Sequence, residues 1–137
     1  MSNSVQTVKY YKMMVPHKTG RGVKIFEHLH ENKVNLLAFL AFPNKGKAQV
    51  DFVPADPVKF TAIAKQAKWK IKGPKMCFII EGKDQVGALI PHGKKLAEAE
   101  INIHATAAVT GGAGRCGAIV WVDPKDVKKA AEALGAK

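Results

Sequence analysis

The sequence predicts an α+β protein built from two similar units in tandem, each an antiparallel sheet with helices on one face. First, the stretch 34–42 (VNLLAFLAF) returns in altered form 67 positions later, at 101–109 (INIHATAAV). Second, strand-like and helix-like periodicities follow one another in the same order in both halves of the chain. Because self-similarity at a fixed spacing indicates a repeated structural unit, we expect two domains. Their ranges are 4–70 and 71–137.

The spacing of 67 aligns residues along most of the chain without a gap. The aligned pairs are Gly20 with Gly87, Leu29 with Leu96, Glu31 with Glu98, Asn35 with Asn102, Ala38 with Ala105, Val53 with Val120, and Asp56-Pro57 with Asp123-Pro124. Two units of 67 residues after a three-residue leader account for all 137 residues. A chance similarity would not keep one register over this length.

Each copy is expected to begin with a strand and a helix. Segments 5–15 and 75–81 are rich in β-branched and aromatic residues, which favour strands. A turn with Gly20 or Gly87 then opens a helix. In the first copy the positions i, i+3, i+4 and i+7 of one helical face are occupied by Gly22, Ile25, Phe26 and Leu29.

Two further strands and a second helix follow in each copy. Alternating apolar residues are expected to share one face of the second strand: Val34, Leu36, Ala38, Leu40 and Phe42, and in the second copy Ile101, Ile103, Ala105, Ala107 and Val109. Turns at 43–46 and 110–114 lead to third strands at about 47–53 and 115–122.

The second helix of each copy is expected to start at an N-cap aspartate, Asp56 or Asp123, with proline at the first helical position. Residues 69–71 are a candidate closing strand of the first unit. The second copy ends at Lys137, so its fourth strand is either missing or borrowed. Each unit thus reads βαββα(β), and two helices on one face of an antiparallel sheet is the ferredoxin-like arrangement.

Two stretches resemble the ACT-domain family. The segment VPHKTGRGVKIFEHLHENKVNLLAF has the strand, turn, glycine, helix and Asn-led second strand of that family, and IEGKDQVGALIPHGKKLAEAEINIHA follows the same plan. The resemblance implies a tandem pair of regulatory domains that bind a small ligand, typically an amino acid. Such domains usually associate side by side and hold ligand between the first strand–helix turn and the start of the second strand. The chain departs from the family at Thr19 and Val86, where proline is common before the glycine.

The strand–helix turns are the main candidate ligand sites. A helix N-terminus offers free N–H groups and a positive dipole end to a carboxylate, and glycine allows close approach. The candidate residues of the turns are His17, Lys18, Thr19, Gly20 and Arg21, and Asp84, Gln85, Val86, Gly87 and Ala88. Those at the start of the second strands are Asn35, Leu36, Asn102 and Ile103. In each case the alternative is a purely structural turn or cap.

The two copies differ on the strand face expected to point away from the helices. There the first copy has Leu37, Phe39 and Ala41, whereas the second has His104 and Thr106 next to Asn102. An apolar outer face indicates a covering surface, either the second copy or another chain, and we expect a homodimer. In the second copy's first helix, His92 and Gly93 occupy the positions of Ile25 and Phe26, so this helix either packs loosely or leaves room for a ligand.

The charge is strongly positive, with 22 Lys+Arg against 11 Asp+Glu and a net charge of +11. This balance favours an anionic partner, so the main alternative function is non-specific nucleic-acid binding by a basic ferredoxin-like protein. The RNA-recognition pattern of that fold requires aromatic residues on the third strand. The stretches GKAQVDFV and GRCGAIVW do not supply them at Ala48, Val50, Cys116 and Ala118.

The remaining expectations concern chemistry and compartment. No nucleophile–base set or carboxylate pair stands out, and neither Cys77 nor Cys116 has metal-ligand spacing. We therefore expect neither catalysis nor a metal or other cofactor. No apolar run is long enough to span a bilayer, and a secretory leader is not recognisable, so a cytoplasmic location is expected. The function predicted is a stand-alone sensor that binds a small amino acid or related carboxylate and acts on an unidentified regulated protein.

Overall fold

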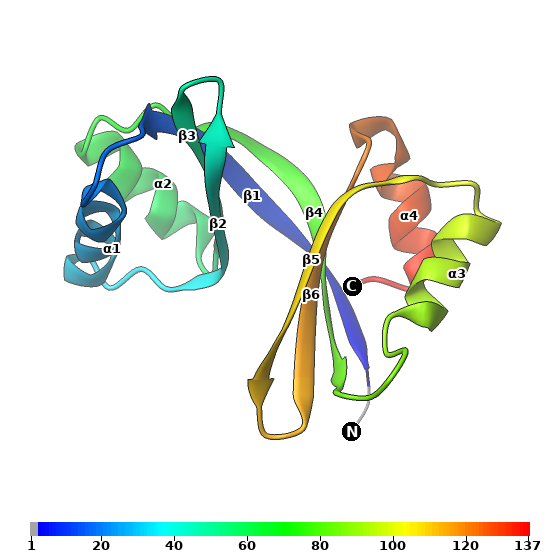
Figure 1. Ribbon diagram of the computed structural model, residues 1–137. Coiled ribbons are helices and arrows are strands. Elements are labelled where there is room, and N and C mark those ends of the chain that lie inside the picture. Colours follow the sequence, from blue (N-terminus) through cyan, green and yellow to red (C-terminus); the bar gives the residue numbers. More distant parts are fainter. Residues whose placement is uncertain (1–2) are drawn as a thin grey trace. The chain divides into compact units, whose positions relative to one another are not determined.

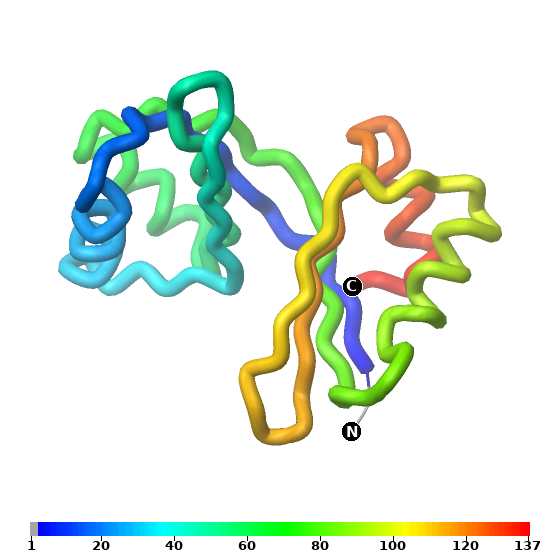
Figure 2. Tube along the Cα trace, in the orientation of Figure 1, coloured from blue at the N-terminus to red at the C-terminus, as the bar shows by residue number. Residues whose placement is uncertain are grey.

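The computed structural model describes residues 3–137, and these form two compact units. The first, here called the N-unit, is Lys9–Lys75. The second, the C-unit, contains Met76–Lys137 together with the N-terminal residues through Val8. Figure 2 follows the chain by residue number from one unit into the other.

The strands form one six-stranded sheet in the order β2-β3-β1-β4-β6-β5, and the N-unit contains its β2-β3-β1-β4 part. Along the chain, the long strand β1 (Ser4–Pro16) leads to α1 (Arg21–Glu31), and β2 (Leu36–Asn44) and β3 (Lys47–Pro54) form a hairpin. After α2 (Pro57–Gln66) the chain enters β4 (Lys72–Lys83), whose first four residues belong to this unit. Figure 1 shows α1 and α2 on the same face of the sheet.

The C-unit repeats this plan, with strand order β1-β4-β6-β5. The rest of β4 leads to α3 (Ile90–Glu98), and β5 (Ile103–Gly112) pairs antiparallel with β6 (Arg115–Val122). A short 3₁₀ turn (Pro124–Asp126) precedes α4 (Val127–Leu134). Figure 1 shows α3 and α4 on one face of their sheet. The expected α+β class, with helices on one face of an antiparallel sheet, is confirmed.

The fourth strand of the N-unit is not the segment 69–71, and that prediction is wrong. The Trp69 amide donates to the Ala64 carbonyl (2.9 Å) and so helps to end α2, while the indole stacks on Phe52. These roles keep the segment out of a strand ladder, and the edge position beside β1 is taken by the start of β4.

The fourth strand of the C-unit is borrowed from β1, one of the two possibilities that the sequence left open. Residues 4–8 of β1 lie beside β4 in that sheet. The last residue also joins them, because the Thr7 amide donates to the Lys137 carbonyl (2.8 Å) and the Lys137 amide donates to the Val5 carbonyl (3.0 Å). That 4–70 and 71–137 form two separate domains stays a prediction.

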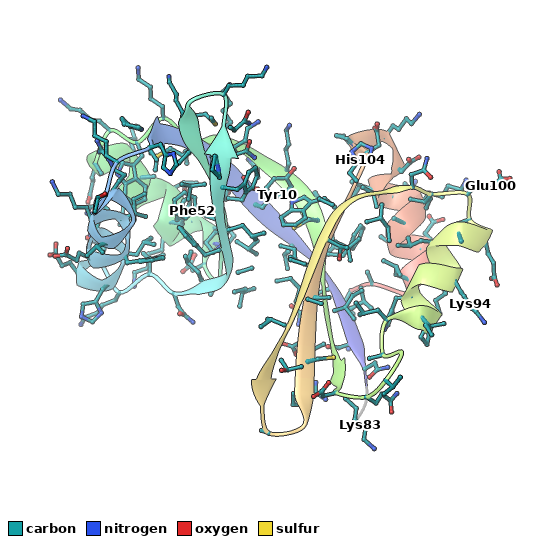
Figure 3. All side chains as sticks on the ribbon, viewed as in Figure 1. Tyr10, Phe52, Lys83, Lys94, Glu100 and His104 are labelled. Atoms are coloured by element: carbon teal, nitrogen blue, oxygen red, sulfur yellow. The ribbon has the colours of Figure 1, made fainter. Side chains whose placement is uncertain are left out.

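An aromatic cluster forms the core of the N-unit between the sheet and its helices. Phe52 and Phe60 are fully buried, and their ring centroids lie 5.0 Å apart. Tyr11 lies 5.1 Å from Phe60, and Trp69 stacks on Phe52 at 5.8 Å. Phe52 is labelled in Figure 3. Such pairs add to the free energy gained from burying the rings.

The strand face expected for Phe39 is wrong, and a bulge is the reason. The β2–β3 register shifts between Leu36 and Ala38, and one extra residue reverses the alternation of side chains that follow. Phe39 therefore packs on the helix side, 5.5 Å from Phe52 and 4.6 Å from Phe26. It consequently provides no argument for a covered outer face.

The spacing between equivalent residues of the two units is not 67 everywhere. Phe39 pairs with Phe52 in the N-unit, and Thr106 pairs with Val120 in the C-unit. Thr106 follows Phe39 by 67 residues, but Val120 follows Phe52 by 68. The gapless alignment of Val53 with Val120 is therefore wrong, because an irregularity between Thr110 and Gly112 adds a residue to the second hairpin.

Replacing Phe60 by alanine is expected to lower the free energy of unfolding by about 3–5 kcal/mol, since it removes a fully buried ring and leaves a cavity. Urea denaturation followed by circular dichroism measures this loss. Val58→Ala on the same helix is the control, because Val58 is 80% exposed and should change the value by less than about 0.5 kcal/mol. Equal effects of the two substitutions would contradict this account of the core.

Candidate functional site

An exposed turn directly precedes the first helix of each unit, as the sequence predicts. In the N-unit, His17, Lys18 and Thr19 are exposed, and Gly20 has a φ of 85° immediately before α1. The Arg21 amide donates to the Lys18 carbonyl (3.2 Å), which closes the turn. The positive φ explains the glycine, because other residues rarely adopt it.

The equivalent turn of the C-unit is longer and lies beside a hollow. The Asp84 amide donates to the Gly114 carbonyl (2.9 Å), which anchors the start of the turn to the β5–β6 hairpin. Further on, the Ala88 amide donates to the Gln85 carbonyl (3.1 Å) and the Ile90 amide to the Gly87 carbonyl (3.0 Å). Helix α3 begins at Ile90, two residues later than the spacing of 67 from Arg21 would place it.

The first hollow, here called the turn pocket, has a volume of about 380 Å³ and lies between this turn and the β5–β6 hairpin. It is lined by Asp84, Gln85, Gly87, Ala88, Leu89, Ala108, Val109, Thr110 and Cys116. Four of the five residues predicted at this turn thus meet in one site. The fifth, Val86, is fully exposed and does not line the pocket.

The chemistry of the turn pocket suits a small polar molecule. The Asp84 carboxylate accepts hydrogen bonds, and the Gln85 amide both donates and accepts. The residue at the N-cap of α3 is Leu89, and no side chain caps the first turn of this helix. Gly87 has a φ of 72°, which favours glycine, and the Cβ of any other residue would lie 2.9 Å from Ile90 Cδ1 and would displace that side chain.

The predicted residues at the start of the second strands do not line the turn pocket. Asn35 is exposed, and its carbonyl accepts from the Ala55 amide (3.0 Å); Leu36 packs against the N-unit core. In the C-unit Asn102 is exposed and does not line the turn pocket. Ile103 lines a second hollow, which is described next.

A second hollow, here called the α3 pocket, lies between α3 and the sheet and has a volume of about 350 Å³. Its lining is almost entirely apolar: Ile80, Leu89, Ile90, His92, Gly93, Leu96, Ile103, Thr106 and Val120. The sequence had left open whether His92 and Gly93 mark loose packing or space for a ligand. The sequence signal for the pocket is the loss of two aromatic residues, because Gly93 and Thr106 take the positions of Phe26 and Phe39.

Thr106 does not share an open polar face with Asn102 and His104, and that prediction is wrong. The β5–β6 register shifts between Ile103 and Ala105, which breaks the alternation in the same way as in the first hairpin. Thr106 lines the α3 pocket, and its hydroxyl donates to the Ile119 carbonyl (2.9 Å). His104, labelled in Figure 3, lies 3.9 Å from the Asp123 carboxylate.

His92 is the buried polar residue of the α3 pocket. Its side chain is 7% exposed, and within residues 3–137 its Nδ1 has no hydrogen-bond partner. Burial, followed by the charge of Lys95, lowers the pKa of His92 below its usual 6.5. Both causes disfavour the charged form, so the imidazole is neutral at pH 7.

Among residues 3–137, no three His, Cys, Asp or Glu side chains gather as they would around a metal ion. Within the same residues, no helix has the length and apolar character needed to cross a membrane.

Solved structures share this fold, although neither a family model nor a curated protein sequence matches the chain. A protein from Bacteroides thetaiotaomicron has a TM-score of 0.78 at 16% identity, over 96% of this chain and 88% of that one. The aspartokinase alpha and beta subunits have a TM-score of 0.64 at 17% identity, over 98% and 95%. The ligand-free regulatory subunit of aspartate kinase from Thermus thermophilus has 0.64 at 12%, over 98% and 96%.

At these identities the likeness concerns the fold. The chain has an ACT-like fold, shared with regulatory subunits of aspartate kinase, as the resemblance in the sequence implied. The match covers nearly the full length of both chains, so it includes both units and not one of them alone.

The buried His92 is expected to make the protein less stable as the pH falls below 6.5. Below that value the unfolded chain binds a proton at His92 while the folded chain, with its lowered pKa, does not, so protonation favours unfolding. Urea denaturation at pH 7, 6 and 5 should give a smaller decrease in His92→Leu than in the unmodified protein. A difference between the two that does not change with pH would contradict the prediction.

Proposed function

We propose that this protein is a regulatory sensor that binds a small amino acid, or a related carboxylate, in the turn pocket of the C-unit. The observation that carries the proposal is that Asp84, Gln85, Gly87 and Ala88 line one hollow at the start of a helix. The sequence resemblance predicted ligand binding at this turn for a separate reason, the ACT-like order of its segments. That structures of the same fold are named as regulatory subunits of aspartate kinase supports a regulatory role.

The residues of the turn pocket match the two ends of an amino acid. The Asp84 carboxylate is exposed enough to stay hydrated when the site is empty, and it can pair with an α-ammonium group. The side-chain amide of Gln85, which also lines the pocket, can donate to the α-carboxylate. Thr110 and Cys116 line the opposite wall and would face the side chain of the ligand.

The proposal includes no catalysis. A sensor of this kind would act by binding a regulated protein when its ligand is present. It would do so in the cytoplasm, as a homodimer, without a cofactor. A homodimer is expected because domains of the ACT family, which the sequence resembles, usually associate side by side. Sedimentation at micromolar concentration should therefore give twice the monomer mass.

A thermal-shift and calorimetric screen of the twenty amino acids tests the proposal. At least one is expected to raise the melting temperature and to bind with saturation. Asp84→Asn should weaken that binding about tenfold, since it removes the charge that pairs with the ammonium group, while leaving a side chain of nearly the same size. Glu132→Gln, on the exposed surface of α4, is the matched control and should bind as the unmodified protein does.

Two outcomes would contradict the proposal. One is the absence of binding by any amino acid to a folded sample. The other is equal affinity in the unmodified protein and in Asp84→Asn.

A second function, non-specific binding of nucleic acid, is favoured by the distribution of charge. Lys9–Lys75 contains 14 Lys+Arg and 4 Asp+Glu, a net charge of +10, whereas the rest of the chain contains 8 and 7, a net charge of +1. The excess of positive charge therefore lies in the N-unit and not at the turn pocket.

Nucleic-acid binding of this kind has a distinctive salt dependence. The logarithm of the association constant should fall linearly with the logarithm of salt concentration, because binding releases counterions. Fluorescence anisotropy with a short labelled DNA duplex between 50 and about 200 mM salt measures the slope. A slope near zero, or no binding at the lowest salt concentration, would exclude this function.

A further inference from the structure

Strand β2 forms one edge of the sheet. It pairs with β3 on one side, and within residues 3–137 no strand pairs with its other side. The irregularity after Leu36 and the ring of Pro43 limit the regular open stretch to residues 38–42, here called the β2 edge. No charged residue and no proline lies in that stretch. Because native edge strands usually carry such residues to block an added strand, the β2 edge is open to one.

Exposed aromatic rings flank the β2 edge on both faces of the sheet. Phe42 is 42% exposed. It pairs with Gln49, which points away from the helices because its neighbour Val50 points into the core beneath them. On the helix face, Phe26 of α1 is 48% exposed, and its ring centroid lies 4.6 Å from that of Phe39. A strand added beside β2 would cover part of both exposed rings, and burial of apolar surface favours association.

The charge of the N-unit defines what such a strand must carry. Lys9–Lys75 has a net charge of +10, and Lys45 and Lys47 lie exposed at the turn that follows β2. This charge attracts an acidic chain and steers it to the surface. A second copy of the protein is disfavoured at this edge, because each N-unit would bring the same charge of +10. The other edge strand, β5, belongs to a unit with a net charge of only +1.

We propose that an acidic, extended segment of the regulated protein adds to the sheet as a strand beside β2. Backbone groups of the β2 edge bond to it, Phe26 and Phe42 cover its apolar side chains, and Lys45 and Lys47 pair with its acidic ones. In this mode of recognition the main chain supplies affinity and alternate side chains supply specificity. The inference rests on the proposed function only in that a regulated protein exists, and it does not depend on a ligand in the turn pocket.

Charge alone does not separate such a peptide from a nucleic acid, because both are anionic. A polynucleotide has no row of amide N–H and C=O groups with which to continue the hydrogen-bond ladder of β2, whereas an extended peptide has one. Its phosphates would bind lysine and arginine side chains wherever these lie on the N-unit. The open backbone of the β2 edge therefore favours the peptide.

A labelled peptide of alternating glutamate and valine, about ten residues long as in a long strand, tests the proposal by fluorescence anisotropy. Saturable binding is expected with a dissociation constant below about 1 mM. The control peptide has the same number of glutamates and two adjacent prolines at its centre. Because proline has no N–H to donate, it should bind about tenfold more weakly. Equal binding of the two peptides, or no saturable binding of the first, would overturn the proposal.

Two double substitutions test whether the peptide meets the lysines beside β2 or only the overall charge. Lys45→Glu with Lys47→Glu should weaken binding of the first peptide about fivefold, since two ion pairs are replaced by repulsion. Lys128→Glu with Lys129→Glu, on the exposed surface of α4, changes the net charge equally and should leave the affinity within about twofold. An equal loss in the two variants would overturn the proposal.

The apolar contact and the backbone contact have separate readouts. Phe42→Ala should weaken the peptide about threefold, whereas Val58→Ala, at an exposed position on α2, should leave it within about twofold. With peptide bound, amide hydrogen exchange should slow within residues 38–42, because an added strand bonds the open backbone groups, and not within β5. Unchanged exchange in residues 38–42, or equal losses in the two variants, would overturn the proposal.

The other possible occupants of the β2 edge give different results. Loss of a homodimer in Phe42→Ala would show that a second copy covers the edge, and it would overturn the proposal. Binding of a DNA duplex by a protein that does not bind the peptide would assign the charge of the N-unit to nucleic acid, with the same consequence. Asp84→Asn should leave peptide binding unchanged. Failure of the amino-acid screen therefore would not affect the β2 edge, and failure of the peptide titration would not affect the turn pocket.

Discussion

The six-stranded sheet of this protein depends on two long strands, β1 and β4, each of which contributes residues to both units. Strand β1 is central in the N-unit, and its first residues also complete the edge of the C-unit sheet; β4 does the reverse. A strand that ended after its own unit would leave an edge of unpaired backbone groups. The length of β1, thirteen residues, and of β4, twelve, follows from this double role.

The two units have the same order of elements, but different kinds of side chain form their cores. The N-unit joins its helices to its sheet through Tyr11, Phe52, Phe60 and Trp69, ring against ring. The core of the C-unit is mainly aliphatic around the buried Phe78, and both hollows described above lie in this unit. Charge divides in the same way, since nearly all of the excess lies in the N-unit. The N-unit therefore has the aromatic packing and the excess of positive charge, whereas the C-unit has the candidate ligand sites.

The sequence predicted well what depends on neighbouring residues. The order of elements, the N-cap at Asp56, which accepts from the Lys59 amide, and the glycine turns at Gly20 and Gly87 follow from local preferences of the backbone. It predicted poorly what depends on pairing. The bulges after Leu36 and Ile103 reversed the faces of Phe39 and Thr106, because side-chain alternation alone does not reveal where a ladder gains a residue.

The sequence by itself determined the βαββα plan, the internal similarity and the turn at Asp84–Ala88, since each is recorded in short-range patterns of residue type. Only the tertiary structure decided which strand closes each sheet, because residues 4–8 and 72–75 act on partners distant in sequence. It also decided that a hollow lies beside Gly93 and Thr106, the residues 67 positions after Phe26 and Phe39. Whether space remains after a ring is lost depends on the surrounding side chains together, and no single stretch of sequence contains that information.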